Sequence, residues 1–479
     1  MSRFAVFRSF PRTFWVSNIM ELFERWGWYG MFIPLALYLT GSTDTGALGF
    51  TQTQKGVLVG TVVMILYFLP TITGAIADKF GYKKVLILSY LILASGYFLM
   101  GLAKSYPGMW AAFLYVALGA GLFKPVVSAS IAKTTNESNS SIGFGIFYMI
   151  VNVGAFIGPF VAALLRQTDW QLVFTMSSIA IALNLVLVIL FYKEPLQERS
   201  SEPLGKTVVS ILKNIGLALS DLKFLAFLII IIGFWTMYNQ LFYTLPVFIE
   251  QWMDTGGIYL FINNISPSLA SFIGTDDGRI SPEMLVNIDA LYIVIFQIAI
   301  SALVMKYRPM NTMITGIFIC IVGIGLWFVT QNAAYLFISI FIFATGEMSS
   351  SPKILEYIGR IAPKDKVALY MGCYYIPMAA GNFFAGLLSG GVYEKLSDKT
   401  SLLRKEVESR GLDIPEVSGT FTQNDFFFFL SQLMEMTRQE LTDYLWITYN
   451  PSKIWIVFTA IGLATVISLV IYQKIVKTR

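Results

Sequence analysis

Twelve long apolar stretches recur along the 479-residue chain, and they restrict it to one broad class of fold. A helix needs about 20 predominantly apolar residues to cross the hydrocarbon core of a bilayer. Composition agrees, because 56% of the residues are hydrophobic and only 13% are charged, whereas soluble domains carry about 25% charged residues. The pattern predicts an all-α membrane protein with twelve transmembrane helices, at residues 13–40, 55–78, 83–103, 108–133, 142–166, 170–193, 222–249, 284–306, 311–330, 333–359, 366–392 and 451–474.

The short loops between these spans differ in charge, and the difference predicts an orientation. Lysine and arginine gather on the side that holds both chain ends, whereas the opposite short loops offer little beyond Lys104 and Arg166. Cytoplasmic loops are enriched in these residues, so we expect both termini in the cytoplasm. The basic residues on that side are Arg3, Arg8, Arg12, Lys79, Lys83, Lys84, Lys306, Arg308, Arg360, Lys364, Lys366, Lys474, Lys477 and Arg479.

Two longer segments divide the chain. Residues 194–221 are polar and then weakly amphipathic, which predicts a cytoplasmic linker between a six-helix bundle at 1–193 and a second at 222–479. Residues 394–450 form a charged, extracytoplasmic insertion with short amphipathic helices. We expect its run Phe426–Leu430 to pack on the outer rim or at the lipid interface. The loop at 250–283 is expected to be polar and to face the same side.

Several kinds of chemistry have little support in the composition. Histidine is absent, and the two cysteines, Cys320 and Cys373, both fall in apolar spans, so we expect no metal site and no disulfide framework. The chain shows no nucleophile elbow or nucleotide-binding loop, so we expect no enzyme and no cofactor. The net charge of +5 is spread over short loops, which argues against nucleic-acid binding. Proton handling without histidine has to rely on carboxylates or on a lysine with a shifted pKa.

The loop between spans two and three carries the first recognisable motif. It reads GAIADKFGYKK and resembles the G-x-x-x-D-x-x-G-x-K/R-K/R loop of the major facilitator superfamily. Six plus six spans around a middle cytoplasmic loop also match that superfamily. The resemblance implies two pseudo-symmetric six-helix bundles, the major facilitator fold. It gives gating or structural roles to Asp78, Lys83 and Lys84, although an ordinary basic hairpin would read similarly.

Three charged residues lie inside the first predicted span, namely Glu21, Glu24 and Arg25. A charge at the bilayer centre costs roughly 2.5–3.5 kcal/mol on insertion scales, so these side chains must pair or face water. Spacings of three and four residues place them on one face of the helix. Because two acids share one local base, the surplus acid can hold or release a proton. A static ion-pair network that locks helices together is the alternative.

The same stretch, ELFERWGWYG from Glu21 to Gly30, resembles the E-x-x-E-R-F-x-Y-Y-G signature of the proton-coupled oligopeptide transporter family. Four further stretches are similar to segments of that family: GAGLFKPVVSA, GIFYMIVNVGAFIGP, GEMSSSPKILEYIGRIAP and MGCYYIPMAAGNFFAG, in spans four, five, ten and eleven. The resemblance implies a symporter that imports di- and tripeptides by alternating access. It implies proton coupling by Glu21, Glu24 and Arg25, and substrate binding by Arg25, Tyr29, Tyr67, Lys124, Asn152, Trp235, Asn239, Gln240, Glu347 and Ser351.

These residue types also suit a zwitterionic ligand on chemical grounds. Arg25 and Lys124, in the first half, offer cations for a carboxylate. Glu347, in the second half, offers an anion for an ammonium group. Each has a simpler alternative, because Lys124 could be a structural cation and Glu347 could neutralise Lys353.

Two helix-breaking prolines, Pro125 and Pro352, mark places where the halves could hinge. On the cytoplasmic side, Lys353 and Glu356 are three residues apart and could form a gate pair.

Span seven departs from the family pattern. It reads FWTMYNQLFYTLP, so Asn239 stands where the family usually carries a glutamate that pairs with the span-four lysine. An amide cannot titrate, which leaves open a proton-independent facilitator, or a symporter of another small zwitterion or anion. A membrane receptor or scaffold that binds a partner through residues 394–450 is the alternative of another class. We expect a monomer in a bacterial inner membrane, with lipid and peptide as partners and protons as the coupling ion.

Overall fold

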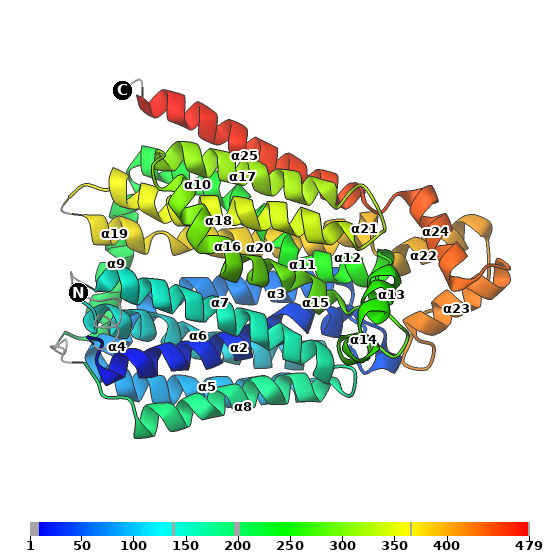
Figure 1. Ribbon diagram of the computed structural model, residues 1–479, viewed down its shortest axis with the longest axis horizontal. Helices are drawn as coiled ribbons and strands as arrows, with labels where there is room; N and C mark the ends of the chain where they lie inside the picture. The colour runs from blue at the N-terminus through cyan, green and yellow to red at the C-terminus, as the bar shows by residue number, and fades with distance from the viewer. Residues whose placement is uncertain (1–8, 137–138, 196–201, 365, 478–479) are drawn as a thin grey trace.

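The chain is almost entirely helical in the computed structural model, which describes residues 9–136, 139–195, 202–364 and 366–477. Within these ranges the only extended pairings are two isolated bridges, so the predicted all-α membrane fold is confirmed. Figure 1 shows long helices lying side by side in two groups, one for each half of the chain. Arg3, Arg8 and Arg479, which contributed to the predicted orientation, lie outside the described residues.

The first group contains the helices that precede the linker. They are α2 (Arg12–Thr40), α3 (Gln52–Phe68), α4 (Pro70–Phe80), α5 (Tyr82–Leu102), α6 (Tyr106–Lys133), α7 (Ser140–Leu165) and α8 (Trp170–Leu190). The linker itself forms a helix, α9 (Leu204–Leu219).

The second group follows the linker. Its helices are α10 (Leu222–Tyr238), α11 (Gln240–Tyr243), α12 (Leu245–Trp252), α15 (Pro282–Val286), α16 (Ile288–Val304), α17 (Pro309–Leu326), α18 (Tyr335–Ile361), α19 (Val367–Gly372), α20 (Tyr375–Leu387), η2 (Leu388–Val392) and α25 (Lys453–Lys477). Outside this group lie α13 (Gly256–Ile265), α14 (Pro267–Ile273), α21 (Tyr393–Leu396), α22 (Lys399–Arg410), α23 (Gln423–Leu433) and α24 (Arg438–Tyr449).

Eight of the described helices are long and apolar enough to cross a membrane, or nine when the bent pair α3 and α4 counts as one span. The remaining predicted spans correspond to α2, α18 and the pair α19 and α20, an arrangement consistent with twelve. Several spans are broken where the sequence predicted one stretch. The axes of α3 and α4 differ by 44°, because Pro70 offers no backbone N–H to continue the ladder.

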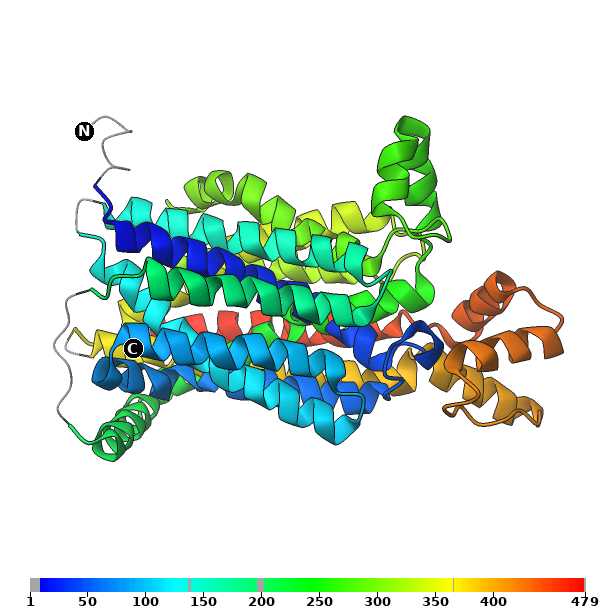
Figure 2. The ribbon, with the colours of Figure 1, turned by 90° about the horizontal axis from the view of Figure 1, so that it is seen from below.

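The two ends of the molecule differ. The start of α2, the end of α25 and the linker helix α9 lie at one end, and α21 to α24 lie at the opposite end (Figures 1 and 2). Following the predicted orientation, we name the first end the inner end and the second the outer end.

Packing between the two halves is concentrated toward the outer end. There α3 packs against α20 and η2, and α7 packs against α15 and α16. Glycines permit the close approach, since a Cβ on Gly56 would lie 2.7 Å from the Cα of Gly390. At the inner end, α4 and α19 each pack against α9. A cavity of about 340 Å³ lies between them and is lined by Lys124, Ile211 and Tyr375. The two halves are therefore in direct helix-to-helix contact toward the outer end and are separated by a cavity at the inner end.

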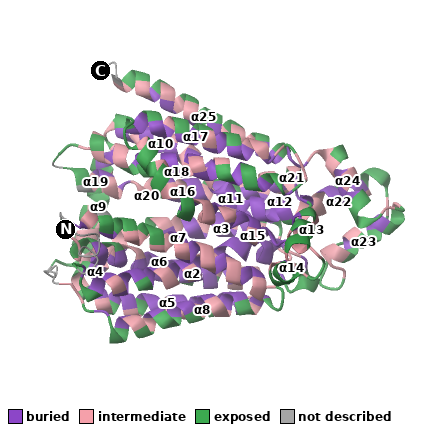
Figure 3. Ribbon diagram, in the orientation of Figure 1, coloured by how far each residue is buried: buried purple, intermediate pink, exposed green. Residues whose placement is uncertain are grey.

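The insertion folds into a small helical layer over the outer end. Phe426 and Leu430 are buried within it, whereas Phe428 and Phe429 are exposed. Figure 3 shows buried and exposed residues mixed along these helices. The apolar run is therefore split between the interior of the layer and its surface.

Four polar contacts bind this layer to the first half of the chain. The backbone N–H of Asn424 donates to Ser42 Oγ at 3.2 Å. Asn424 Nδ2 donates to Asp44 Oδ2 at 2.9 Å, and Gln52 Nε2 donates to Asp398 Oδ1 at 3.1 Å. The backbone N–H of Thr53 donates to Glu394 Oε2 at 2.6 Å.

The prediction of a polar loop at 250–283 was wrong. The segment contains α13 and α14, which project from the outer end (Figure 2). Their exposed side chains include the apolar residues Leu260, Phe261, Ile265 and Phe272. Glycine and serine between these residues hid the helical spacing. An amphipathic helix pair of this kind suits the lipid headgroup region.

The glycine contact at the outer end gives a first prediction. Gly56→Leu should push α3 away from α20 and η2, because the added side chain meets backbone atoms that cannot rotate aside. Overpacking of this kind costs about 1–3 kcal/mol, and the cost falls only on the closed-outside form. We expect an outer-end cysteine placed at Gln52 to react faster with a membrane-impermeant thiol reagent. Gly145→Leu, where an added Cβ meets nothing within 4 Å, is the control and should leave the rate unchanged. Equal rates in both variants would contradict the proposed closure.

Candidate functional site

The three charges of the first span form one buried cluster on α2. Arg25 Nε lies 3.2 Å from Glu21 Oε1 and donates to Glu24 Oε2 at 2.6 Å. All three side chains are buried, and the Arg25 guanidinium lies 5.9 Å from the centre of the Tyr29 ring. One base therefore holds two acids, while Glu24 Oε1 has no hydrogen-bond partner among the described residues.

Glycines of α7 make room for this charged face. A Cβ on Gly154 would lie 2.8 Å from Arg25 Cβ, and one on Gly158 would lie 2.7 Å from the backbone N of Gly30. Because α2 and α7 approach so closely, the cluster is shielded from lipid. The charges consequently point into the protein, where pairing offsets the cost of leaving water.

A pocket of about 50 Å³ lies between the two halves. The first half contributes Tyr29 from α2 and Asn152 from α7, and the second half contributes Tyr238, Asp289 and Glu347. Three of the residues that the sequence singled out, Tyr29, Asn152 and Glu347, thus meet at one place, although they are far apart in the chain.

The acidic wall of this pocket contains a residue that the sequence analysis missed. Tyr238 donates its hydroxyl to Glu347 Oε1 at 2.8 Å, and Asp289 is buried beside the same cavity. Neither Glu347 Oε2 nor Asp289 Oδ1 has a hydrogen-bond partner in the described chain. The signal was available, because Asp289 is a carboxylate inside an apolar span, as Glu21 is. These unpartnered oxygens suit a bound ammonium group.

Lys124 lies toward the inner end, away from that acidic wall. Its Nζ sits 4.4 Å from the centre of the Tyr67 ring, and it lines the inner cavity together with Pro125. No carboxylate in the described residues lies within ion-pair distance of it. The cation that a peptide carboxylate needs is therefore present, and the acid that span seven would supply is replaced by Asn239.

Asn239 and Gln240 do not face the central pocket with free polar groups. Asn239 Nδ2 donates to Trp235 O at 2.7 Å, and Gln240 Nε2 donates to Thr236 O at 2.9 Å. Gln240 Oε1 also accepts from Thr244 at 2.5 Å. Gln240 Nε2 also reaches Ala385 O of α20 at 3.4 Å, so both amide groups already have hydrogen-bond partners within the protein. Trp235 is buried, with no partner for its indole N–H among the described residues.

The remaining predicted residues lie along α18 and at the inner ends of the helices. Ser351 and Pro352 follow Glu347 by about one turn on α18. Lys353 Nζ lies 2.7 Å from Glu356 Oε2, so Lys353 pairs with Glu356 and the alternative in which Glu347 neutralises it was wrong. Glu356 also pairs with Arg360 at 2.5 Å.

In the loop motif, the Tyr82 hydroxyl donates to Asp78 Oδ1 at 3.4 Å. Lys83 Nζ donates to the carbonyls of Ile189 and Tyr192 at 3.0 and 3.3 Å, and Lys84 is exposed. The loop thereby fastens the start of α5 to the end of α8.

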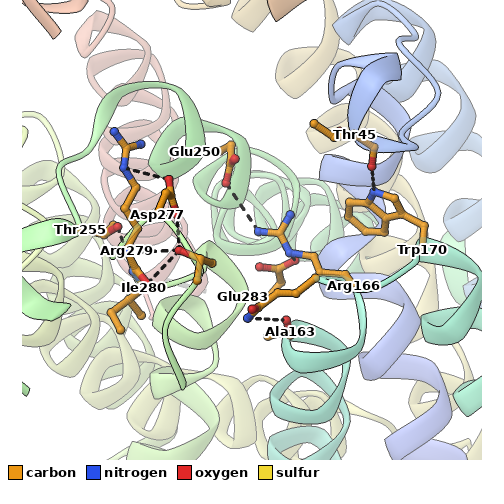
Figure 4. A network of polar contacts seen from close by, with 12 residues as sticks. Thr45, Ala163, Arg166, Trp170, Glu250, Thr255, Asp277, Arg279, Ile280 and Glu283 are labelled. Atoms are coloured by element: carbon orange, nitrogen blue, oxygen red, sulfur yellow. Dashed lines mark hydrogen bonds and ion pairs between the residues drawn. The ribbon is translucent and has the colours of Figure 1, made fainter. Parts of the chain in front are cut away.

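A second contact between the halves, at the outer end, was also missed. Figure 4 shows Arg166, at the end of α7, between Glu283 and Glu250 of the second half. Arg166 Nε lies 2.7 Å from Glu283 Oε1, and Arg166 Nη2 lies 3.7 Å from Glu250 Oε2. Nearby, Asn287 Nδ2 donates to Phe156 O at 2.7 Å. These contacts hold the outer ends of α7 and α15 together. The sequence offered one signal for this contact, because Arg166 is the basic residue of an otherwise weakly charged outer loop.

Comparison with known proteins agrees with this architecture. The family model described as Major Facilitator Superfamily matches residues 15–274, more than half of the chain. Dipeptide and tripeptide permease B of Photorhabdus asymbiotica is 23% identical over 435 residues, which cover 79% of this chain and 86% of the relative. Dipeptide and tripeptide permease A of Erwinia pyrifoliae is 30% identical over 220 residues, 42% of each chain.

Solved structures agree in fold. A crystal structure of a peptide transporter POT in complex with sulfate superposes with a TM-score of 0.70 and 17% identity, covering 98% of this chain and 95% of that one. A POT family transporter in complex with 5-aminolevulinic acid gives a TM-score of 0.65 with 19% identity, covering 93% and 99%. The chain belongs to the major facilitator superfamily, and the resemblance to its proton-coupled oligopeptide transporter family, predicted from the motifs, is confirmed.

Proposed function

We propose that the chain is a proton-coupled symporter that imports di- and tripeptides by alternating access. The observation that carries the proposal is the central pocket, where Tyr29 and Asn152 of one half face the unpartnered carboxylate oxygens of Glu347 and Asp289 in the other. At about 50 Å³ the pocket is contracted in this conformation, and in our proposal it widens to admit a peptide. The similarity to dipeptide and tripeptide permeases supports the substrate class. The protein acts as a permease and needs no cofactor, with protons as the coupling ion.

The peptide termini distinguish the two halves in this mechanism. Glu347 and Asp289 bind the ammonium end, and Lys124 and Arg25 attract the carboxylate end. Tyr29 and Asn152 bind backbone amides and leave the side chains of the peptide free. A ligand that contacts both halves stabilises their closed arrangement. In our proposal, α3 separates from α20 when the carrier opens outward, and α9 changes its contacts with α4 and α19 when the inner end closes.

Coupling rests on the α2 cluster. When Glu21 or Glu24 takes up a proton from outside, Arg25 loses one of its two partners and becomes available to the peptide carboxylate. Release of that proton to the cytoplasm restores the pair. Asn239 takes no part in proton transfer, because an amide does not titrate in this range.

Three other functions remain as alternatives. Asn239 favours a proton-independent facilitator, and the neighbour solved with 5-aminolevulinic acid favours another small zwitterion. A receptor that binds a partner through residues 394–450 is a third reading. We further propose a monomer in a bacterial inner membrane with both termini in the cytoplasm, in agreement with the placement of the insertion opposite the chain ends (Figure 1).

Uptake of labelled dialanine into proteoliposomes tests the function. We expect uptake to rise several-fold when an inward proton gradient is imposed, and Glu347→Gln to abolish most of it, because the ammonium loses its counter-charge. Glu408→Gln, at an exposed position of the insertion, is the matched control and should transport normally. Uptake that ignores the gradient would identify a facilitator, and no uptake of dialanine or tripeptides would refute the substrate class.

The contribution of Asp289 is separable from that of Glu347. Hydrogen bonds to charged groups contribute about 1.5–3 kcal/mol, so Asp289→Asn should raise the KM for dialanine by about tenfold or more. Because asparagine retains the shape of the side chain, the variant should keep its expression and thermal stability. An N-acetylated dialanine lacks the ammonium group. It should therefore be an equally weak competitor of dialanine uptake in the unmodified protein and in Asp289→Asn. An unchanged KM would remove Asp289 from the site.

The α2 cluster gives a stability prediction. Arg25→Met leaves two buried acids without their base, and breaking a buried ion pair in this way costs about 3–5 kcal/mol. We expect a marked fall in the unfolding temperature of the detergent-solubilised protein. The triple variant Glu21→Gln, Glu24→Gln, Arg25→Met should recover most of that stability but not gradient-driven uptake. An unfolding temperature of Arg25→Met equal to that of the unmodified protein would show that the ion-pair cluster does not stabilise the fold.

A further inference from the structure

A cavity of about 480 Å³ lies at the outer end, separate from the central pocket. It is enclosed by the outer ends of α2 and α8, by α12, and by α22, α23 and α24 of the insertion. Leu37 and Trp170 line it from the first half, Gln251 from the second, and Lys399, Asn424 and Arg438 from the insertion. We call this cavity the outer vestibule. Ligand pockets for small molecules are typically about 300–1,000 Å³, so a dipeptide can fit.

The charges that line the outer vestibule are unbalanced. Four cations face it, Arg166, Arg279, Lys399 and Arg438, against two carboxylates, Glu250 and Asp277. Arg166 pairs with Glu283 and Glu250, and Arg279 lies 3.5 Å from Asp277. No carboxylate in the described residues lies within ion-pair distance of Lys399 or Arg438. The excess positive charge therefore resides on the insertion.

Lys399 contacts side chains from three different helices. Its Nζ donates to Thr442 Oγ1 at 2.7 Å and lies 4.4 Å from the ring centre of Phe427 and 5.4 Å from that of Trp252. Burial, and then the Arg279 charge, lower the pKa of Lys399 to about 7, although Glu250 and Asp443 act in the opposite sense. An anion placed beside Lys399 would favour the charged form that burial disfavours.

Amide side chains complete the lining. Gln251, Gln423, Asn424 and Gln439 all border the cavity, and each can bond a peptide backbone or a carboxylate. Gln251 and Asn424 already bond acids of the insertion or the first half, Asp398 and Asp44, at 2.9 Å. The walls therefore combine excess positive charge with donors and acceptors, which is the composition of a site for a small polar anion.

We propose that the outer vestibule is a second binding site, which takes peptides of net negative charge and holds their acidic side chain against Lys399. This inference rests on the proposed peptide transport. The vestibule raises the concentration of acidic peptides at the outer mouth, so its effect falls on the KM for those peptides and spares the maximal rate.

The vestibule also borders the contact that closes the outer end. Glu250, which is about half exposed, holds Arg166 only at 3.7 Å, and both side chains line the cavity (Figure 4). A ligand carboxylate can take the place of Glu250 at this guanidinium. Arrival of an acidic peptide thereby weakens one of the two pairs that join α7 to the second half.

Direct binding tests the proposal. Purified full-length protein in lipid nanodiscs is titrated calorimetrically with Ala-Glu and with Ala-Ala. We expect Lys399→Gln to raise the Kd for Ala-Glu by at least fivefold and to leave that for Ala-Ala unchanged. Lys395→Gln removes the same charge from an exposed position outside the cavity and should alter neither. Equal losses for both peptides, or none, would overturn the proposal, as would inorganic phosphate competing as well as Ala-Glu.

The pH dependence of Ala-Glu binding provides a second test of the role of Lys399. Lys399 loses its proton as the pH rises through about 7, so binding of Ala-Glu should weaken by up to about tenfold between pH 6 and pH 8. The charged groups facing Lys399 are Arg279, Arg438, Glu250 and Asp443. Lys399→Arg keeps its charge throughout and should bind Ala-Glu with a flat pH profile. A profile as steep as that of the unmodified protein would refute the role of Lys399.

The outcome does not depend on the transport assay. Absence of dialanine uptake by the unmodified protein would refute the proposed function. Binding of Ala-Glu is measured at equilibrium without transport. Its dependence on Lys399 can therefore be confirmed or refuted whatever the uptake assay shows.

Discussion

The pairing of Arg25 with Glu21 and Glu24 is the interaction on which the rest of the arrangement depends. Charges in the middle of a membrane helix are tolerated only when they face protein or water, and here Gly154 and Gly158 of α7 bring the backbones close enough to cover them. That requirement fixes which face of α2 turns inward. The same face carries Tyr29 into the central pocket, so one electrostatic constraint positions both the proposed coupling group and a wall of the proposed binding site.

The two ends of a peptide are then distinguished by geometry. The second half presents Glu347 and Asp289 with oxygens that no described residue satisfies, and the first half presents Lys124 against the Tyr67 ring. In the proposed mechanism a peptide places its ammonium end on the second half and its carboxylate end on the first, so that binding draws the halves together. Recognition of the two backbone termini would leave the side chains of the peptide without specific contacts.

Much of the fold followed from the sequence, because apolar length and loop charge are direct demands of the bilayer. The motifs identified Glu21, Glu24, Arg25, Tyr29, Asn152 and Glu347 as site candidates, and the structure places Tyr29, Asn152 and Glu347 around one pocket. The sequence did not reveal that Asn239 and Gln240 already bond neighbouring backbone carbonyls, since that depends on their rotamers. Asp289 and Arg166 were not predicted because they lie outside any motif. The helices α13 and α14 were not predicted because glycine and serine obscured the helical spacing of their apolar residues.

The hydrogen bonds between the insertion and the first half have a consequence for the rate of the proposed transport cycle. Asn424 with Asp44, Gln52 with Asp398 and the N–H of Thr53 with Glu394 all join the closed outer end, and all must break whenever the carrier turns back to face outward, loaded or empty. Their cost is the same on every return. In the proposed cycle these contacts favour the form that is closed at the outer end, so we expect the return to the outward-open form to be the slow stage of turnover and substrate passage to be faster.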